Sequence, residues 1–348
     1  MIKEWEKHLI IYNSSIKDAL ARLDKLGAEA VLLIIDEENR LKGSLSDGDV
    51  RRGIMNGALI EHPVSSIMHR KPKFIKKGDT DINKIVGFRE AGLRVVPIID
   101  GQDRIERIIS FRDKRSYLPL DAVIMAGGKG ERLRPLTESI PKPMLRIGSK
   151  PILERSIESL SKFGICDIWI SINYLGEQIQ EFFGDGSSRN INISYVKEEK
   201  PLGTIGSASL IDTFRHEHVL VMNSDIITDL DYERFYQYFL STDADLAVLS
   251  VPFRIGVPYA VLETRDNTVF SLQEKPTYTY YSNGGMYLMK RSALRLMTRG
   301  QHFNATDLMT LMIERNMKVV AYNHNGMWID IGRKEDLAKA DSIFEMVD

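Results

Sequence analysis

Cysteine is almost absent from this chain, since Cys166 is the only one among 348 residues. An internal disulfide and a zinc site built from cysteines are therefore excluded, and the composition fits a reducing compartment. Cys166 lies at the start of an apolar segment, GICDIWI (residues 164–170), which predicts a small buried side chain rather than a nucleophile. The seven histidines show no His-x-x-x-His or similar metal spacing, so a histidine zinc site is also disfavoured.

Long apolar runs and an excess of one charge are missing as well. No stretch reaches the roughly 18 apolar residues of a membrane span, and the first residues, MIKEWEK, lack the apolar core of a signal peptide. Lysine and arginine number 47 against 48 for aspartate and glutamate, so no basic surface for nucleic acid or anionic lipid is predicted. We expect a soluble, cytoplasmic protein whose partners are small molecules.

The length of the chain predicts two domains, because 348 residues exceed the roughly 250–300 at which a single core stops growing. The sequence changes character at KRSYLPL (residues 114–120), where Pro119 breaks any helix before an apolar strand. We therefore predict one domain over residues 1–118 and a second over residues 119–348.

The first domain contains the same segment twice. Residues 30–49 align without a gap on residues 94–113, at an offset of 98 − 34 = 64. Each copy, about residues 5–60 and 64–118, reads as helix, strand, polar turn, strand and helix. The identical pairs are Ile34 with Ile98, Ile35 with Ile99, Asp36 with Asp100, Arg40 with Arg104, Ser46 with Ser110, and Asp49 with Asp113.

This repeat resembles a tandem pair of cystathionine-β-synthase (CBS) domains, a family in which such pairs bind regulatory nucleotides. The resemblance nominates the serine and aspartate of each Ser-x-x-Asp motif as contacts for phosphate and ribose: Ser46, Asp49, Ser110 and Asp113. A helix N-terminus offers free N–H groups to an anion, which suits this role. The same residues also suit helix capping without any ligand, so a structural or oligomerising pair is the alternative.

Apolar strands alternate with helical stretches in the second domain. This alternation predicts an α/β fold with a mostly parallel, doubly wound, Rossmann-like sheet and helices on both faces. Ligands of such sheets bind beyond the carboxyl ends of the strands, where the unusual residues of this chain gather. The expected strands are residues 122–126, 168–172, 193–196, 219–222 and 246–251, and the expected helices are residues 152–163, 177–183, 205–214 and 232–239.

The strongest motif is the glycine-rich segment MAGGKGERLRPLT (residues 125–137), followed by PKPM (residues 141–144). Its glycines follow a strand, so the backbone can turn tightly and bring several N–H groups against phosphate oxygens. Arg132 and Lys142 add cations that can neutralise a triphosphate and its pyrophosphate leaving group.

Two other glycine loops do not match this segment. Leu133 stands where a dinucleotide-binding fingerprint needs glycine or alanine, and the chain has no Gly-Lys-Ser/Thr of a P-loop. A dinucleotide-dependent oxidoreductase is therefore disfavoured.

Together these segments resemble the signature of sugar-1-phosphate nucleotidyltransferases, and the likeness runs over about residues 120–345. It implies a nucleotide-diphospho-sugar transferase fold, with Arg132 and Lys142 as the catalytic, phosphate-handling pair. Glu131 stands where the family usually has threonine, which removes one hydroxyl contact and leaves the arginine in place. The nucleotide-binding residues that the resemblance implies are Ala126, Gly127, Gly128, Gly130, Glu198, Pro201, Leu202, Gly203 and Thr204.

Further segments match the same family in the expected order. EEKPLGTIG (residues 198–206) resembles the loop that holds the base, with Thr204 placed to cap a following helix. Guanine presents adjacent donors, so Glu198 or Glu199 could accept both if one points inward, whereas solvated loop charges are the alternative. The sugar-phosphate contacts that the resemblance implies are Tyr259, Glu274, Lys275, Asn283 and Gly285.

Asp225 ends a buried strand and Asp330 lies in the motif WIDIG (residues 328–332). By resemblance the two form a metal pair for Mg²⁺ (or Mn²⁺), which typically takes one or two carboxylates plus substrate phosphates. A turn aspartate and a helix-capping aspartate are the respective alternatives. Taken singly, each alternative is as reasonable as the metal role.

The predicted reaction joins a nucleoside triphosphate, with GTP favoured, to a sugar 1-phosphate, with glucosamine 1-phosphate favoured, and releases pyrophosphate. The order of a CBS pair before a transferase resembles the glucosamine-1-phosphate guanylyltransferases of bacterial legionaminic acid biosynthesis. Mannose 1-phosphate as acceptor, thymidylyl or uridylyl transfer, and a non-catalytic nucleotide-sensing subunit stay open. A homo-oligomer is expected.

Overall fold

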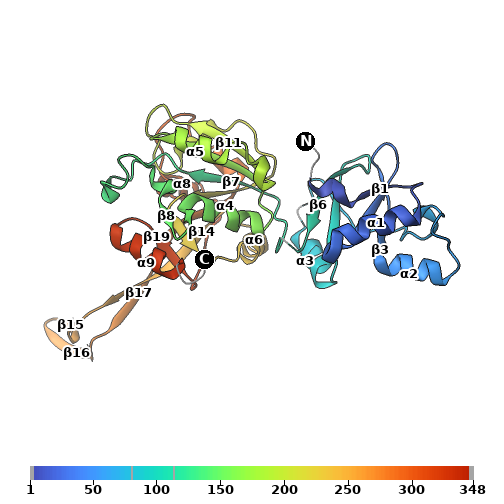
Figure 1. Ribbon diagram of the computed structural model, residues 1–348. Coiled ribbons are helices and arrows are strands. Elements are labelled where there is room, and N and C mark those ends of the chain that lie inside the picture. The colour runs from blue at the N-terminus through green and yellow to red at the C-terminus, as the bar shows by residue number, and fades with distance from the viewer. Residues whose placement is uncertain (1–3, 80, 113, 345–348) are drawn as a thin grey trace. The chain divides into compact units, whose positions relative to one another are not determined.

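The computed structural model describes residues 4–79, 81–112 and 114–344. The chain divides into two compact units (Figure 1). The first unit runs to Pro119 and includes Ser161–Ile165, and the second comprises Leu120–Leu160 and the residues from Cys166 onward. None of the helices in the described ranges is both long and apolar enough to cross a membrane.

Two three-stranded sheets form the first unit, and each joins one parallel strand pair to one antiparallel pair. In each sheet a helix connects the first strand to the second. The strands are β1 (Leu9–Ile11), β2 (Val31–Ile35), β3 (Leu41–Ser46), β4 (Ile75–Lys76), β5 (Val95–Ile99) and β6 (Ile105–Ser110); the helices are α1 (Ile16–Leu26), α2 (Asp47–Met55) and α3 (Ile82–Glu90).

The two copies of the sequence repeat share one pattern of strand pairing. Val31 pairs with Ser46 in the first sheet and Val95 pairs with Ser110 in the second, which preserves the 98 − 34 = 64 offset. The two copies meet at their polar turns, where the amide of Leu41 donates to Asp103 O at 2.9 Å. The equivalent amide in the second copy, that of Ile105, donates to Asn39 O at 3.2 Å, so an internal two-fold relation links the copies.

Two of the shared residues have a local structural role. Arg40 Nε donates to Asp36 Oδ2 at 2.8 Å, and Arg104 Nε donates to Asp100 Oδ2 at the same distance. The other oxygen of each aspartate accepts from the arginine's own amide. These identities therefore hold the polar turns and need no ligand.

The expected helix at the end of the second copy is wrong. The first copy continues from β3 into α2, whereas the described residues after β6 form a turn in which the amide of Lys114 donates to Ser110 O at 3.1 Å. The next strand starts at Leu120, and Pro119 just before it cannot donate a helical hydrogen bond. Asp113 lies outside the described residues.

The second unit is built on a seven-stranded sheet in the order β11-β10-β7-β12-β17-β14-β18. Only β17 among these runs antiparallel to its neighbours, so the predicted mostly parallel α/β sheet is confirmed. The strands are β7 (Leu120–Met125), β10 (Asp167–Ile172), β11 (Asn192–Lys197), β12 (His218–Asn223), β14 (Leu246–Gly256), β17 (Thr277–Lys290) and β18 (Val319–Asn323).

The helices of the second unit follow the predicted alternation, with one exception. Residues 205–214 were expected to form a helix, but only a 3₁₀ turn over Gly206–Leu210 is present. The amides of Ile205 and Gly206 both donate to Phe303 O, so tertiary hydrogen bonds take the place of a helical ladder. The helices are α4 (Ile152–Lys162), α5 (Gly176–Phe183), α6 (Tyr232–Ser241), α7 (Arg291–Leu294), α8 (Ala305–Glu314) and α9 (Lys334–Phe344).

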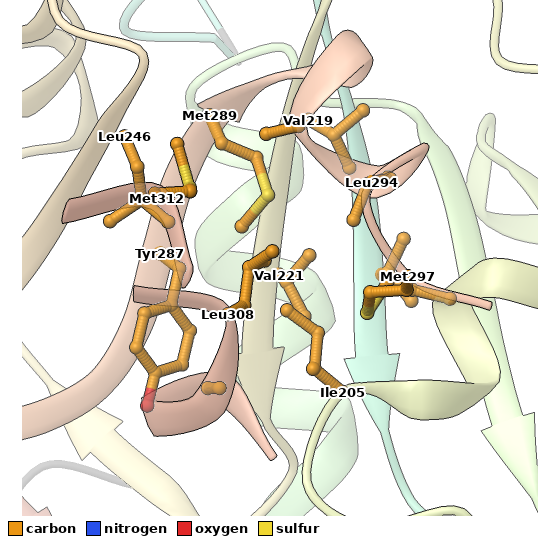
Figure 2. Packing of buried hydrophobic residues seen from close by; sticks show 14 of the residues in the cluster. Ile205, Val219, Val221, Leu246, Tyr287, Met289, Leu294, Met297, Leu308 and Met312 are labelled. Carbon is orange, nitrogen blue, oxygen red and sulfur yellow. The ribbon is translucent and has the colours of Figure 1, made fainter. Parts of the chain in front are cut away.

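The main core lies between the central strands and α8. Figure 2 shows Val221 and Tyr287 from neighbouring strands packed with Leu308 and Met312 from the helix. Burying an apolar side chain of this size contributes about 1.5–3 kcal/mol. This packing fixes the sheet whose strand ends carry the candidate site.

A long two-stranded arm leaves the second unit. β14 was expected to end at residue 251 but runs to Gly256, and it pairs with β17 down to Thr277. Beyond this stem lies a hairpin of β15 (Val261–Arg265) and β16 (Thr268–Gln273), which Figure 1 shows extending away from the body of the unit. We call residues 252–282 the arm.

Candidate active site

The glycine-rich segment turns sharply where β7 ends. The amide of Ala126 still donates to Ser171 O of the neighbouring strand, at 2.9 Å. Gly130 has φ +63°, and a Cβ there would lie 3.0 Å from side-chain atoms of both Lys142 and Thr137, so glycine is required. A Cβ on Gly128 would meet no described atom within 4 Å, as expected for a backbone that a ligand approaches.

Two cations lie on the short turns that follow this loop. Arg132 is exposed and lies in the 3₁₀ turn Glu131–Leu133. Its guanidinium lies beside Gly332, near the end of the chain, where an added Cβ would be 3.4 Å from Arg132 Nη1. Lys142 is half-buried and donates through Nζ to Asp225 Oδ2. The structure thus brings the predicted catalytic pair to the segments that carry the predicted metal pair.

A two-stranded ribbon brings the two predicted metal ligands together. Asp225 immediately precedes β13 (Ile226–Thr228), which pairs antiparallel with β19 (Trp328–Asp330) so that Ile226 faces Asp330. The amide of Ile331 also donates to Asp225 O at 2.9 Å. Burial, and then the Asp225 carboxylate, raise the pKa of Asp330, while Lys142 and Arg132 act in the opposite direction.

The alternatives for these two aspartates do not match the geometry. The first residue of α9 is Lys334, and the amide of Arg333 donates to Asp336 rather than to Asp330, so Asp330 does not cap this helix. Asp225 directs its carboxylate to Lys142, not to a turn amide.

These residues fit a divalent cation. Asp225 Oδ1 is buried and has no hydrogen-bond partner among the described residues, which leaves a charged oxygen for a ligand. The described part of the chain contains no group of three or more His, Cys, Asp or Glu side chains that could form a closed metal site. Two carboxylates, completed by substrate phosphates and water, are a usual Mg²⁺ environment, so Asp225 and Asp330 would hold the ion.

Glu198 holds the predicted base loop in place. Its buried carboxylate accepts from Ser171 Oγ at 2.6 Å and from the amide of Leu202 at 3.1 Å. A Cβ on Gly127 would lie 3.1 Å from Glu198 Oε1, so this carboxylate also adjoins the glycine-rich loop. Glu199 is exposed.

The rest of the base loop is clamped to the segment before α8. Leu202 O accepts from the amide of Phe303 at 2.9 Å. The expected capping role of Thr204 is wrong in its target, because Thr204 Oγ1 accepts from the amide of Ala305 at 2.9 Å and so caps α8. No α-helix follows Thr204 directly, so there are no helix amides there to donate to its hydroxyl. Pro201 is exposed beside this clamp.

Gly203→Ala is expected to lower the free energy of unfolding by about 1–3 kcal/mol, the usual cost of a strained backbone. Gly203 has φ +81°, and a Cβ there would lie 2.5 Å from Phe303 O. Urea unfolding measures the effect, and Gly128→Ala is the matched control because nothing lies within 4 Å of its added Cβ. Equal stability of the two variants would contradict the clamp.

Two of the predicted sugar-phosphate residues, Asn283 and Gly285, lie where β17 passes from the arm into the seven-stranded sheet. Asn283 Oδ1 accepts from the amide of Gly285 at 2.9 Å, and Asn283 Nδ2 donates to Tyr287 at 2.8 Å. Gly285 has φ +71°, and a Cβ would lie 2.8 Å from Asn223 Nδ2 at the end of β12. Both residues therefore lie next to the strand end that carries Asp225.

The other three sugar-phosphate candidates lie on the arm. Tyr259 is 76% exposed, and Glu274 and Lys275 are exposed at the turn before β17. Within the described residues, none of these three side chains forms a hydrogen bond or ion pair. The structure does not bring them to the carboxylate pair of their own chain.

The two Ser-x-x-Asp motifs of the first unit are not equivalent. Ser46 and Asp49 form a capping box on α2, in which Asp49 Oδ2 accepts from the Ser46 amide at 2.8 Å and from its hydroxyl at 2.6 Å. Ser110 instead donates its hydroxyl to the buried Glu29 of the first copy. Burial raises the pKa of Glu29. The hydrogen bond from Ser110 and the nearby cations lower it further than that, so the pKa lies below its usual value.

Sequence reasoning missed two parts of the site. Ser171 is a fully buried hydroxyl in an apolar strand, and a buried polar group needs a partner, so its position carried a signal. The segment Phe303–Ala305 carried none, since no motif marks it and its contact with residues 202–206 joins positions about 100 apart in sequence.

Residues 121–345 match the family described as Nucleotidyl transferase, which is well over half of the chain. Mannose-1-phosphate guanylyltransferase of Mycobacterium tuberculosis is 31% identical over 229 residues, covering 63% of this chain and 63% of that protein. D-glycero-alpha-D-manno-heptose 1-phosphate guanylyltransferase of Aneurinibacillus thermoaerophilus is 30% identical over 225 residues, covering 64% of this chain and 96% of that protein. The chain thus spans less than two thirds of the first relative's length.

The solved structure of HddC from Yersinia pseudotuberculosis resembles the second unit with a TM-score of 0.51 and 29% identity, covering 65% of this chain and 99% of that one. The same protein complexed with GMP-PN gives a TM-score of 0.50 at 28% identity. The residues that the family model matches include the seven-stranded sheet and the paired carboxylates Asp225 and Asp330. This chain therefore belongs to the Nucleotidyl transferase family.

Proposed function

We propose that this protein transfers a nucleoside monophosphate from a nucleoside triphosphate to a sugar 1-phosphate and releases pyrophosphate. The observation that carries the proposal is the meeting of Asp225, Asp330, Lys142 and Arg132 beside the glycine-rich loop, at the carboxyl end of the central strands. Strand ends of this kind are where ligands of α/β sheets bind.

An oxygen of the sugar 1-phosphate attacks the α-phosphorus in line, the bond to the pyrophosphate breaks, and the electron pair leaves with pyrophosphate. The attacking oxygen is already anionic at neutral pH, so no residue has to remove a proton from it. The chain has to position two polyanions and neutralise their charge. The backbone of Gly127 to Gly130 orients the triphosphate, while Arg132 and Lys142 face the charge that develops on the leaving group.

Asp225 and Asp330 would hold Mg²⁺ or Mn²⁺, which supplies charge neutralisation and a template for the two phosphate groups when bound. Lys142 has a second task in this arrangement. Its ammonium pairs with Asp225, which offsets the repulsion between the two carboxylates.

We propose GTP as the nucleotide and glucosamine 1-phosphate as the acceptor. The relatives named guanylyltransferases and the solved complex with GMP-PN support guanine. Mannose 1-phosphate, heptose 1-phosphate and glucose 1-phosphate are the competing acceptors, and the relatives include a UTP–glucose-1-phosphate uridylyltransferase from a Synechocystis strain.

The test measures pyrophosphate release with each of four nucleoside triphosphates against this panel of sugar 1-phosphates, in the presence of Mg²⁺. We expect the highest kcat/KM with GTP and glucosamine 1-phosphate. A higher rate with UTP or TTP would overturn the guanylyl assignment and leave the transferase assignment standing. No pyrophosphate from any pair would favour a non-catalytic nucleotide-sensing protein.

Glu198→Gln is expected to lower kcat/KM with every nucleoside triphosphate. Both oxygens of Glu198 accept from protein donors, and glutamine can satisfy only one of these donors, which leaves the other unpaired at a cost of about 1–3 kcal/mol. Each oxygen keeps a lone pair that a guanine could use, so a drop confined to GTP would show base reading instead of loop support. Glu199→Gln, at an exposed neighbour, is the matched control.

We further propose that the first unit is a CBS pair that binds a regulatory nucleotide through Ser46 and Asp49, with Ser110 and Asp113 as the second motif. The 64-residue repeat and its internal two-fold relation support this, and homo-oligomerisation through the same unit is part of the proposal. The Ser110 hydroxyl donates to the buried Glu29 outside its own motif, whereas Ser46 donates to Asp49 within its motif, which favours the first motif as the binding site.

Ser46→Ala is expected to weaken binding of a nucleoside mono- or diphosphate to the full chain at least about tenfold, since one charged hydrogen bond is lost. Isothermal titration with the adenine and guanine nucleotides measures this. Ser15→Ala removes the equivalent cap from α1, where Ser15 pairs with Asp18 in the same way, and controls for helix stability. Equal loss in both variants would mean that Ser46 is only a cap.

A further inference from the structure

The turn that follows β6 borders a pocket with cationic walls. The pocket measures about 480 Å³, which falls within the roughly 300–1,000 Å³ of small-molecule binding sites. The described residues that line it all belong to the first unit. They are one phenylalanine and five cationic residues: Phe111, Arg89, Arg112, Lys114, Arg115 and Lys162.

The pocket lies where the second copy departs from the first. By the 64-residue offset, residues 111–115 correspond to residues 47–51, which begin α2 in the first copy, whereas the described residues of the second copy form a turn there. Val50 is fully buried in the core of the first copy, and its counterpart Lys114 (114 − 50 = 64) is only half-buried. A cation that lines the pocket therefore stands where the first copy buries an apolar side chain.

The second copy has also lost a carboxylate at this place. Arg51 of the first copy pairs with Asp47 Oδ2 at 3.3 Å. Phe111 stands at the position of that aspartate and offers no anion to Arg115, the counterpart of that arginine. Arg115 instead lies over the ring of Phe163, with 5.9 Å from its guanidinium carbon to the ring centroid. The replacement leaves the charge of Arg115 without an ion pair among the described residues.

Three further cations of the pocket have no carboxylate partner among the described residues: Arg112, Lys114 and Lys162. Lys114 Nζ donates to a neutral acceptor, Ser161 Oγ, at 2.6 Å. Asp113 lies outside the described residues, and its one charge balances at most one of the five cations. The lining of the pocket therefore carries an excess of positive charge.

Hydrogen bonds to the backbone hold the walls of the pocket together. Arg89, near the end of α3, donates through Nη1 to Arg115 O. The amide of Arg115 donates to Lys162 O at 2.6 Å, which fixes the turn to the last residue of α4. The cations thus come from three separate segments that the fold brings together, not from one run of charged residues.

Linked phosphates suit this arrangement. Guanidinium groups donate in pairs to phosphate oxygens, and ammonium groups add compact positive charges. Like charges around one concavity repel each other, and a bound polyanion removes that repulsion. A chain of two or three phosphates carries several negative charges along its length, so it contacts several of these cations at once, whereas a chloride ion or a single carboxylate contacts few.

We propose that this pocket binds a chain of linked phosphates, whether inorganic or part of a nucleotide. Ser46 and Asp49 do not line it, so the site is separate from the regulatory nucleotide site proposed at those residues. It does not depend on the transferase reaction either. The binding groups are the cations that have no carboxylate partner among the described residues: Arg112, Lys114, Arg115 and Lys162.

Lysine acetylation of the full chain, read residue by residue by mass spectrometry, tests the proposal. Inorganic triphosphate in chelator should lower the acetylation rates of Lys114 and Lys162 about tenfold once it reaches about ten times its dissociation constant. Lys25 and Lys77, which are exposed on the same unit, should keep their rates. Sodium chloride at equal ionic strength should protect none of the four. An unchanged rate at either pocket lysine would overturn the proposal.

The double variant Arg112→Ala/Arg115→Ala should need at least about tenfold more triphosphate for the same protection, because two phosphate contacts are lost. Arg51→Ala/Arg70→Ala removes the same charge from exposed positions of the same unit and is the matched control. A thermal melt of each variant checks that it is folded. Equal weakening in both double variants would show attraction by net charge alone and would contradict binding in the pocket.

Further arms of the experiment separate this site from the other proposals. ATP and GTP should protect Lys114 as inorganic triphosphate does, and protection by nucleotides alone would overturn recognition of the phosphate chain. Ser46→Ala should leave the protection unchanged, whereas its loss would assign the phosphates to the regulatory nucleotide site. Protection of Lys142 without Lys114 would place the anion at the candidate active site, which would contradict the pocket and leave the proposed transferase function standing.

Discussion

Asp225→Asn is expected to lower kcat at least about 10²–10³-fold while the protein stays folded, because a preorganised charge at the reacting phosphates is lost. The structure adds a second cause, since Lys142 loses its anionic partner. Titration of Mg²⁺ against pyrophosphate release should show weakened metal dependence in the variant. Parental activity in saturating chelator, for either protein, would remove the metal assignment.

Asp330→Asn is expected to lower activity to a similar extent but to raise thermal stability in chelator. Burial and the Asp225 carboxylate raise the pKa of Asp330 above its unfolded value, so the ionised form opposes folding at neutral pH. That opposition is relieved as the pH falls through the raised pKa, where the folded state binds the proton more tightly than the unfolded state does. Calorimetry should therefore show a higher Tm for the variant at pH 7 and a smaller difference in acid.

Arg132→Ala is expected to cost about 2.7–4 kcal/mol of transition-state stabilisation, or roughly 10²–10³-fold in kcat. Arg132 is exposed, and no hydrogen bond or ion pair of its side chain is present within the described residues, so Tm should fall only slightly, through the lost attraction to the Asp330 carboxylate. Arg132→Lys should recover only part of the rate, because a point charge cannot make a two-pronged contact with phosphate.

Arg134→Ala provides the control for Arg132→Ala. Arg134 is exposed on the same loop and also carries one positive charge. A parental rate for Arg132→Ala, or an equal loss in both variants, would require a different role for this loop.

The local pattern of apolar residues was sufficient to predict the strands and helices that bury an apolar face. The strand before the glycine-rich loop, α4, α6 and the strand that ends at Asn223 lie within two residues of their expected bounds, because apolar periodicity and burial agree there. The helix expected over residues 205–214 failed because the amides of Ile205 and Gly206 bond to Phe303, which no local pattern shows.

The site divides in the same way. Gly130 and Lys142 could be assigned from a motif because they lie within one short segment, and their proximity follows from that segment's turns. The fixed position of Glu198 could not be assigned, because its orientation depends on Ser171 of a neighbouring strand and on a loop amide.

By itself, the sequence determined the family signature, the 64-residue repeat and the mostly parallel α/β sheet, since each rests on residues close together in the chain or on a regular period. Only the tertiary structure decided that Asp225 and Asp330 adjoin, because β13 and β19 pair across about 100 residues of sequence. It also separated Glu274 and Lys275 from that pair, by carrying them out on the arm. Contacts between distant segments depend on how the whole chain packs, and a local pattern of residues does not contain that information.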